Sequence, residues 1–212
     1  MTVDGRVVRG ERTRTMVLDT AVALATEAGL DGLSLGQLAD RLGVSKSGLF
    51  AHWRSKEELQ LATVERARDL VIEQVISPAL RAPRGVRRLF ALHEHRLTYY
   101  GDGTLPGACF FAKAEFEYNV HPGPVRDRLA ECLDEWLVLI RRLVTESVTA
   151  GELAAHTDVG QLAYEIDALG LAVALQSRLN PSEPSYQYSR RAVLARLRAL
   201  CPEPDLLPEG ST

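Results

Sequence analysis

The sequence has no hydrophobic run long enough to cross a membrane and only three cysteines. A membrane-spanning helix needs about 18 consecutive apolar residues. The arginine-rich N-terminus is not followed by the uncharged apolar stretch of a secretory signal, so we expect a cytoplasmic protein. Cys109, Cys132 and Cys201 are odd in number and lack the paired spacing of metal ligands. Cys109 and Cys132 lie in apolar segments, where free cysteines usually behave as small hydrophobic residues.

The sequence also lacks the motifs of common enzyme classes. It contains no Gly-rich phosphate loop, no metal-ligand spacing and no nucleophile elbow. His93 and His95 are two residues apart, so on a helix their rings point away from each other and cannot share a metal ion. We therefore expect no enzymatic activity, no metal and no cofactor.

Charge does not by itself indicate a nucleic-acid partner. The formal net charge is −3, and residues 1–60 hold eight basic and eight acidic side chains. The basic residues are nevertheless clustered, and DNA affinity depends on local positive charge that faces phosphates. The clusters comprise an N-terminal arm of four arginines and a second group forty residues later: Arg6, Arg9, Arg12 and Arg14, then Lys46, Arg54 and Lys56.

Hydrophobic periodicity predicts an all-α fold. Several segments repeat with a period of 3.6 residues, and none shows a sustained alternation of period two. No proline precedes Pro78, and later prolines mark joints between helices. We expect about nine helices, an N-terminal domain over residues 1–54, a second domain over 55–201 and a flexible tail over 202–212. The expected helices span residues 10–28, 34–42, 45–52, 55–76, 84–100, 107–118, 125–150, 158–179 and 185–200.

Three capping patterns predict a helix-turn-helix over residues 34–53. Ser34 with Gln37 forms a capping box, and Ser45 can cap the next helix. A second capping box, Ser55 with Glu58, opens the long helix that follows. Gly43 suits the left-handed turn between the two short helices. In such a motif the second helix enters the major groove, and its first residues lie nearest the base edges.

The string GVSKSGLFAHWRSKEEL over residues 43–59 resembles the signature of the tetracycline-repressor (TetR) family of bacterial regulators. The resemblance extends back through LSLGQLADRLGV. It implies a helix-turn-helix domain followed by a helical body that binds ligand and dimerises. Where the family usually has tyrosine this chain has Phe50, which removes one hydrogen bond to phosphate. The DNA-binding residues that we expect are Ser34, Gln37, Ser45, Lys46, Ser47, Gly48, Phe50, His52 and Lys56.

Three of the expected DNA contacts have open alternatives. His52 is either a phosphate donor or a ring that orders the junction with the following helix. The arginine arm either reaches the minor groove or phosphates next to the helix-turn-helix, or is a solvated tail. Ser45, Ser47 and Lys46 could likewise be two capping residues and a solvated charge.

Eight of the thirteen aromatic residues lie between positions 90 and 136. Ligand pockets are apolar and aromatic with a few polar groups, although aromatics at helical spacing can equally form an ordinary core. The family resemblance implies a small-molecule pocket in this region. The expected ligand-binding residues are Phe90, His93, Tyr100, Cys109, Phe110, Phe111, Glu115, Phe116, Leu133 and Trp136.

The segment 158–179 is apolar on nearly every side, so it is buried in a core or at a subunit interface. The family resemblance implies a four-helix bundle between two copies. Ala163, Ala168 and Gly170 would permit close approach there. The predicted interface residues are Leu162, Ile166, Leu169, Val173, Val193 and Leu197.

The resulting hypothesis is a repressor that binds a palindromic operator as a homodimer and is released by a small apolar or aromatic effector. A two-fold dimer would place its two recognition helices about one DNA turn apart. The alternative is a regulator of the same fold that acts as an activator or responds to a protein partner.

Overall fold

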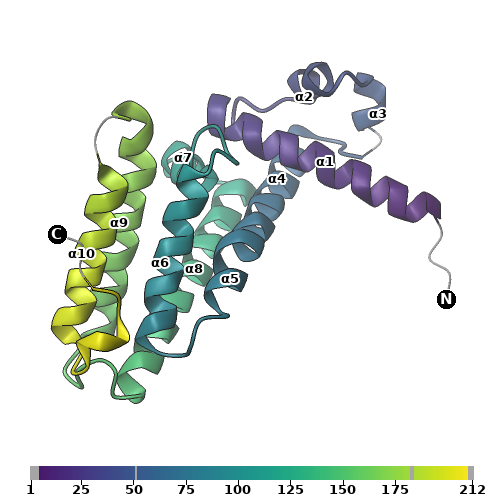
Figure 1. The fold of residues 1–212 in the computed structure, drawn as a ribbon. Helices are drawn as coiled ribbons and strands as arrows, with labels where there is room; N and C mark the ends of the chain where they lie inside the picture. Colours follow the sequence, from purple (N-terminus) through teal and green to yellow (C-terminus); the bar gives the residue numbers. More distant parts are fainter. Residues whose placement is uncertain (1–4, 51, 182–183, 210–212) are drawn as a thin grey trace. The chain divides into compact units, whose positions relative to one another are not determined.

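The computed structural model describes the backbone of residues 5–50, 52–181 and 184–209, and the side chains of residues 13–49, 52–181 and 184–209 (Figure 1). Within these ranges the chain is helical without strands, which confirms the predicted fold class. No helix in the described ranges is both long and apolar enough to span a membrane. The elements are α1 Gly5–Ala28, α2 Leu35–Leu42, α3 Lys46–Phe50, α4 Lys56–Val71, the π-helical turn η1 Ile72–Ile76, α5 Ser77–Ala79, α6 Val86–Gly101, α7 Phe110–Tyr118, α8 Pro124–Thr149, α9 Val159–Leu179, α10 Ser185–Leu200 and the 3-10 turn η2 Pro204–Leu206.

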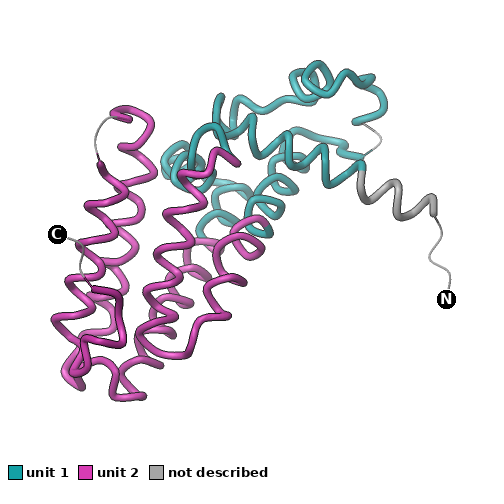
Figure 2. The backbone as a smooth tube through the Cα atoms, viewed as in Figure 1, with its two compact units in different colours: residues 1–69, 105–130 teal, residues 70–104, 131–212 magenta. Residues whose placement is uncertain are grey.

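The chain forms two compact units, coloured separately in Figure 2. Unit 1 comprises Met1–Asp69 and Leu105–Ala130, and unit 2 comprises Leu70–Thr104 and Glu131–Thr212. The predicted boundary after residue 54 differs from this division, because α7 and the first turns of α8 belong to the same unit as the N-terminal helices. Local sequence patterns could not indicate this, since the segments that come together are about 80 residues apart.

The core of unit 1 forms where α1 packs against α2 and around one tryptophan. Ala21 and Val22 of α1 are fully buried, as are Leu38 of α2 and Leu59 of α4. Trp53, between α3 and α4, is also fully buried, and the Arg14 guanidinium lies 5.8 Å from the centre of its ring. Burial of these side chains fixes the helix-turn-helix against α1.

The core of unit 2 forms where α9 packs against α6 and α10. Five of the six predicted interface residues lie in this core rather than on a surface, and the sixth, Leu169, is half-buried. The prediction that the five buried side chains form a seam between two copies is therefore wrong, and the assignment of Leu169 stays a prediction. The five occupy the face of α9 and α10 that is turned to their own chain. The buried five are Leu162, Ile166, Val173, Val193 and Leu197.

The C-terminal segment packs against its own chain up to Pro208. Residues 204–206 form a 3-10 turn, and Leu207 is buried. The Arg198 side chain of α10 donates hydrogen bonds from Nη1 to the carbonyl oxygens of Leu207 (3.3 Å) and Pro208 (2.8 Å). Part of the predicted flexible tail thus has contacts with α10 through one arginine and one buried apolar side chain, and its flexibility stays a prediction.

Candidate nucleic-acid interface

The predicted helix-turn-helix is formed by α2, a left-handed glycine and α3. Ser34 is the N-cap of α2: its Oγ accepts the Gln37 N–H (3.2 Å) and lies 3.2 Å from Gln37 Oε1. Gly43 ends α2 at φ +65°, a conformation that costs glycine little and other residues more. The N–H of Val44 then returns to the Ala39 carbonyl (3.1 Å). These local hydrogen bonds fix the angle at which the chain enters α3.

The first residues of α3 present a polar face to solvent. Ser45 Oγ accepts the Gly48 N–H (3.2 Å) and the Ser47 hydroxyl (3.3 Å). Residues 45 to 48 are all exposed, whereas Leu49 on the opposite face is buried. The helix is therefore anchored on one side and leaves its other side free to meet a partner.

Lys46 lies across the first turn of α2. A Cβ atom built on Gly36 would stand 3.0 Å from Lys46 Cε and 3.2 Å from Nζ. The absence of a side chain at Gly36 thus leaves room for the lysine. Sequence reasoning did not single out Gly36, because its neighbour Lys46 is ten residues further along the chain.

The remaining predicted DNA contacts lie around the start of α4. Lys56 Nζ forms an exposed ion pair with Asp31 Oδ1 (2.9 Å). His52 is exposed, and its ring centre is 5.6 Å from that of Trp53. Glu58 accepts the N–H of Arg54 (2.7 Å) and donates its own N–H to Ser55 Oγ (3.0 Å). The side chains of Phe50, Arg6, Arg9 and Arg12 lie outside the part of the chain that the structure describes.

The ten predicted ligand-binding residues are divided between the two units. In unit 1, Phe110 and Phe111 contact edge to face, with ring centres 5.3 Å apart, and Cys109 caps α7 by accepting the Ala112 N–H (3.4 Å). Phe116 is 79% exposed, so its assignment to an enclosed pocket is wrong. Glu115 is half-buried. The unit 2 members are Phe90, His93, Tyr100, Leu133 and Trp136.

Inside unit 2 a buried ion pair joins three helices. Arg96 Nη1 of α6 lies 3.0 Å from Asp167 Oδ1 of α9. The indole N–H of Trp136 on α8 donates to the same oxygen (2.8 Å). The guanidinium also donates from Nε to the Tyr100 hydroxyl (2.7 Å) and lies 5.1 Å from the Trp136 ring centre. The sequence prediction included Tyr100 and Trp136 among the ligand-binding residues but did not include Arg96 or Asp167.

Gly170 leaves the space that this arginine occupies. A Cβ atom at Gly170 would stand 2.5 Å from Arg96 Nη1 and 2.7 Å from Cζ. From the sequence we expected Gly170 to let helices of two copies approach each other closely. Instead, its missing side chain admits a guanidinium from the same chain.

His93 is the one predicted polar ligand residue that is deeply buried in unit 2. The Ser189 hydroxyl donates to the Leu169 carbonyl (2.9 Å) and lies 3.2 Å from His93 Nε2. Because that hydroxyl proton is committed to Leu169, we assign the imidazole proton to Nε2. Burial, helped by the charge of Arg96, lowers the pKa of His93 to about 3, so the ring is neutral. Its Nδ1 has no hydrogen-bond partner among the described residues.

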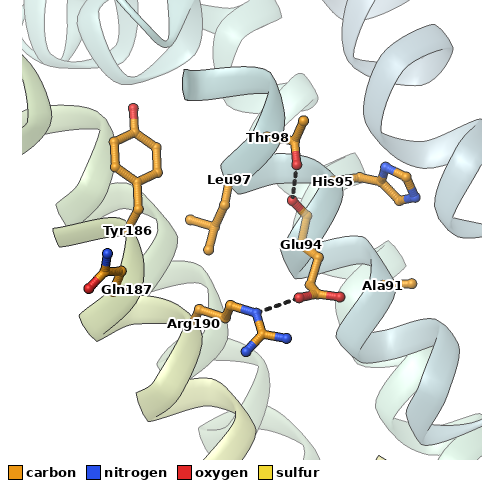
Figure 3. Close-up of a pocket in the computed structure, with 8 residues that line it drawn as sticks. All are labelled: Ala91, Glu94, His95, Leu97, Thr98, Tyr186, Gln187 and Arg190. Atoms are coloured by element: carbon orange, nitrogen blue, oxygen red, sulfur yellow. Dashed lines mark hydrogen bonds and ion pairs between the residues drawn. The ribbon is translucent and has the colours of Figure 1, made fainter. Parts of the chain in front are cut away.

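A groove between α6 and α10 lies elsewhere in unit 2 (Figure 3). Its volume is about 530 Å³ and it is open to solvent. An ion pair between Arg190 Nε and Glu94 Oε1 (2.6 Å) crosses it. The predicted ligand residues are not among those that line it, which are Ala91, Glu94, His95, Leu97, Thr98, Tyr186, Gln187 and Arg190.

Comparison with known families gives matches along most of the chain. The model described as "Bacterial regulatory proteins, tetR family" matches residues 17–63. The model described as "Tetracyclin repressor-like, C-terminal domain" matches residues 85–193, which are 109 of the 212 residues.

Individual relatives and solved structures agree with these matches. The HTH-type transcriptional regulator SrpR of Pseudomonas putida is 23% identical over 154 residues, which cover 70% of this chain and 67% of SrpR. A TetR transcriptional regulator from Chloroflexus aurantiacus has a similar fold, with a TM-score of 0.83 at 24% identity over 91% of this chain and 98% of that one. AibR, solved with isovaleryl coenzyme A and operator DNA, has a TM-score of 0.63 at 23% identity over 75% of this chain and 84% of AibR.

The sequence motif, the capped helix-turn-helix and both family matches agree. The prediction from residues 43–59 is confirmed, and the chain belongs to the TetR family of DNA-binding transcriptional regulators, which are not enzymes.

Proposed function

We propose that this chain is a repressor that binds a palindromic operator as a homodimer and is released from it by a small effector. The observation that carries the proposal is the exposed polar face of α3, which follows a capped α2 at helix-turn-helix spacing. In this motif the second helix lies in the major groove. Ser45, Lys46, Ser47 and Gly48 would then meet the DNA.

The chemistry of this face favours few charged contacts. Lys46 supplies one ammonium, and the serine hydroxyls can donate to phosphates or base acceptors. Gly48 allows the backbone to approach the DNA closely. Since Lys56 is already paired with Asp31, we infer that operator affinity depends more on dimer geometry than on bulk positive charge.

An outward apolar stripe on α9 and α10 supports the homodimer. Tyr164, Ala168 and Leu175 are exposed and recur at the spacing of one face of α9. A second exposed row with helical spacing lies on α10 and comprises Tyr188, Ala192, Ala195 and Ala199. Exposed apolar faces of this kind mark interaction surfaces, and the small residues permit close helix packing. Two copies related by a two-fold axis would cover both stripes at once.

The buried cluster in unit 2 supports the effector. Trp136 and Tyr100 flank the Arg96 guanidinium, and His93 Nδ1 offers a buried acceptor without a partner in the described chain. An apolar ligand with one hydrogen-bond donor suits such surroundings. AibR, which has a similar fold, was solved with isovaleryl coenzyme A. By linkage, an effector weakens DNA binding only as far as it prefers the conformation that does not bind DNA.

Selection of bound fragments from random DNA tests this proposal most directly. We expect enrichment of a palindrome whose half-sites are centred about one DNA turn apart, roughly 34–36 Å. Fluorescence anisotropy on the selected duplex then gives the dissociation constant and its dependence on salt. Failure to enrich any sequence under low-salt conditions would contradict operator binding.

Replacing Lys46 by alanine should weaken operator binding and lower the slope of log K against log salt by about one unit, if Lys46 contacts one phosphate. The matched control is Arg87→Ala, which removes one charge from an exposed position on α6. That variant should keep the wild-type slope. A Lys46→Ala variant with an unchanged slope would show that Lys46 does not meet phosphate.

A further inference from the structure

Residues 105–118, from the middle of the chain, are fastened within unit 1 to the end of α1 and to the turn that leads into α2. Two side chains of α7 make most of these contacts, Glu117 and Lys113. We call this pair the α7 clamp. The inference drawn from it rests on the proposed operator binding and concerns how α2 and α3 are held for that task.

Glu117 accepts two backbone N–H groups of the turn. Its Oε2 accepts from Leu30 (2.7 Å) and its Oε1 from Asp31 (3.1 Å). Hydrogen bonds to an ionised carboxylate are stronger than those between neutral groups. The preceding residue, Gly29, has φ +90°, and a Cβ atom there would stand 2.7 Å from Glu117 Oε1. The turn is therefore shaped to receive this carboxylate.

Lys113 holds the last turn of α1. Its Nζ donates to the carbonyl oxygens of Thr26 (3.2 Å) and Glu27 (2.7 Å). These carbonyls lie at a helix C-terminus, where the last turn lacks intrahelical donors and the dipole favours a cation. Gly107 adds a third contact, because its N–H donates to Thr26 Oγ1 (3.1 Å). A Cβ atom at Gly107 would stand 2.2 Å from the Thr26 carbonyl oxygen, so the two segments are as close as glycine allows.

The same turn is held from α4. The Gln60 side-chain amide donates to the Leu30 carbonyl (2.9 Å) and to the Tyr118 hydroxyl (2.9 Å). Burial, with the nearby charges of Asp31 and Glu117, raises the pKa of Tyr118 to about 12. The hydroxyl therefore stays neutral and can accept this bond. Lys56 holds Asp31 by the ion pair described above.

We propose that Glu117 and Lys113 are positioning residues for operator recognition. They fix where α1 ends and in which direction the chain leaves toward α2, which begins four residues after Asp31. The turn contains Gly29 and Gly32, so without the clamp it would sample many conformations. DNA binding would then have to order the turn at a cost in affinity. Neither side chain touches the exposed face of α3 that meets DNA in the proposal.

The test compares Glu117→Gln with the wild-type protein on the selected operator and on unrelated duplex DNA. The amide has one acceptor oxygen in place of two, so at most one of the two N–H groups keeps its partner. We expect the operator dissociation constant of the active dimer to rise at least fivefold, with the affinity for unrelated DNA unchanged. Amide hydrogen exchange at Leu30 and Asp31 should become faster. Lys113→Met should act in the same direction, because it keeps the stem and removes the donor.

Asp127→Asn is the matched control. It removes one negative charge from the same unit, at an exposed carboxylate of α8 whose ion pair is with the adjacent Arg126, and it should behave as wild type. A role confined to stability would lower the folded fraction without changing the ratio of operator to unrelated affinity. An unchanged ratio, or a rise in operator affinity, in Glu117→Gln overturns the positioning role. If the wild-type protein itself prefers no sequence, operator binding and the inference fail together.

Discussion

Replacing Asp167 by alanine is expected to lower the free energy of unfolding of the protein by about 3–5 kcal/mol. The substitution removes the Asp167 carboxylate that lies 3.0 Å from Arg96 Nη1, and only 9% of the Arg96 side chain is exposed. It also removes the acceptor of the Trp136 indole N–H. Urea denaturation followed by circular dichroism measures the change, and tryptophan fluorescence follows Trp53 of unit 1 and Trp136 of unit 2 together.

Glu165→Ala is the control on the same helix. Glu165 pairs with Arg196 (2.7 Å), but that guanidinium is 45% exposed. Exposed pairs contribute about 0–1 kcal/mol because water already solvates both charges. We therefore expect a much smaller loss. Equal decreases in the free energy of unfolding of the two variants would show that the buried Arg96–Asp167 pair contributes no more to stability than the exposed pair.

A double variant separates the pair from its surroundings. Replacing Arg96 by methionine in the Asp167→Ala protein also removes the positive charge while keeping most of the side-chain volume. Buried pairs replaced on both sides by apolar groups are often close to neutral in stability. The second substitution should therefore recover much of the stability lost in the first.

The helix-turn-helix was predictable because its determinants are local. Ser34 caps a backbone N–H three residues away, and Gly43 makes a turn that needs a left-handed residue. Such hydrogen bonds join residues that are close in sequence, so they can be predicted from the order of residue types. The same holds for the boundaries of α8 and α9, which agree with the predicted ranges to within one residue.

The outward stripe that we propose as the dimer surface was not predictable in the same way. The segment 158–179 is apolar on nearly all sides, so its periodicity does not say which side faces the chain's own core. Leu162 and Ile166 pack inward. The outward face holds Tyr164 and Leu175. The sequence prediction selected neither residue for the interface.

The ligand set and the α7 clamp depend on contacts between distant positions. Arg96 and Asp167 are 71 residues apart, and Glu117 is 87 residues from Leu30. Periodicity places Arg96 on the same face of α6 as His93 and Tyr100, but it does not supply the partner on another helix. The only local signal is Arg96 itself, a charged residue within an otherwise apolar face of α6. It indicates a buried ion pair but does not identify the acidic partner.

Replacing Leu175 by glutamate should convert the proposed dimer into a monomer. Leu175 is 50% exposed in the single chain and lies in the outward stripe of α9. Across a two-fold axis each substitution occurs twice, so two carboxylates would be buried in the interface without partners. Analytical ultracentrifugation at micromolar concentration measures the mass directly. The operator affinity should fall by about a hundredfold or more, because two linked half-site contacts become independent.

Val138→Glu provides the comparison that decides the point. Val138 is an exposed aliphatic residue of α8, 58% accessible, and it lies outside the stripe on α9 and α10. The same change in charge there should leave both the mass and the operator affinity near the wild-type values. If Leu175→Glu also remains a dimer, the outward face of α9 is not the subunit interface. If both variants dissociate, the interface includes α8 as well as the stripe on α9 and α10.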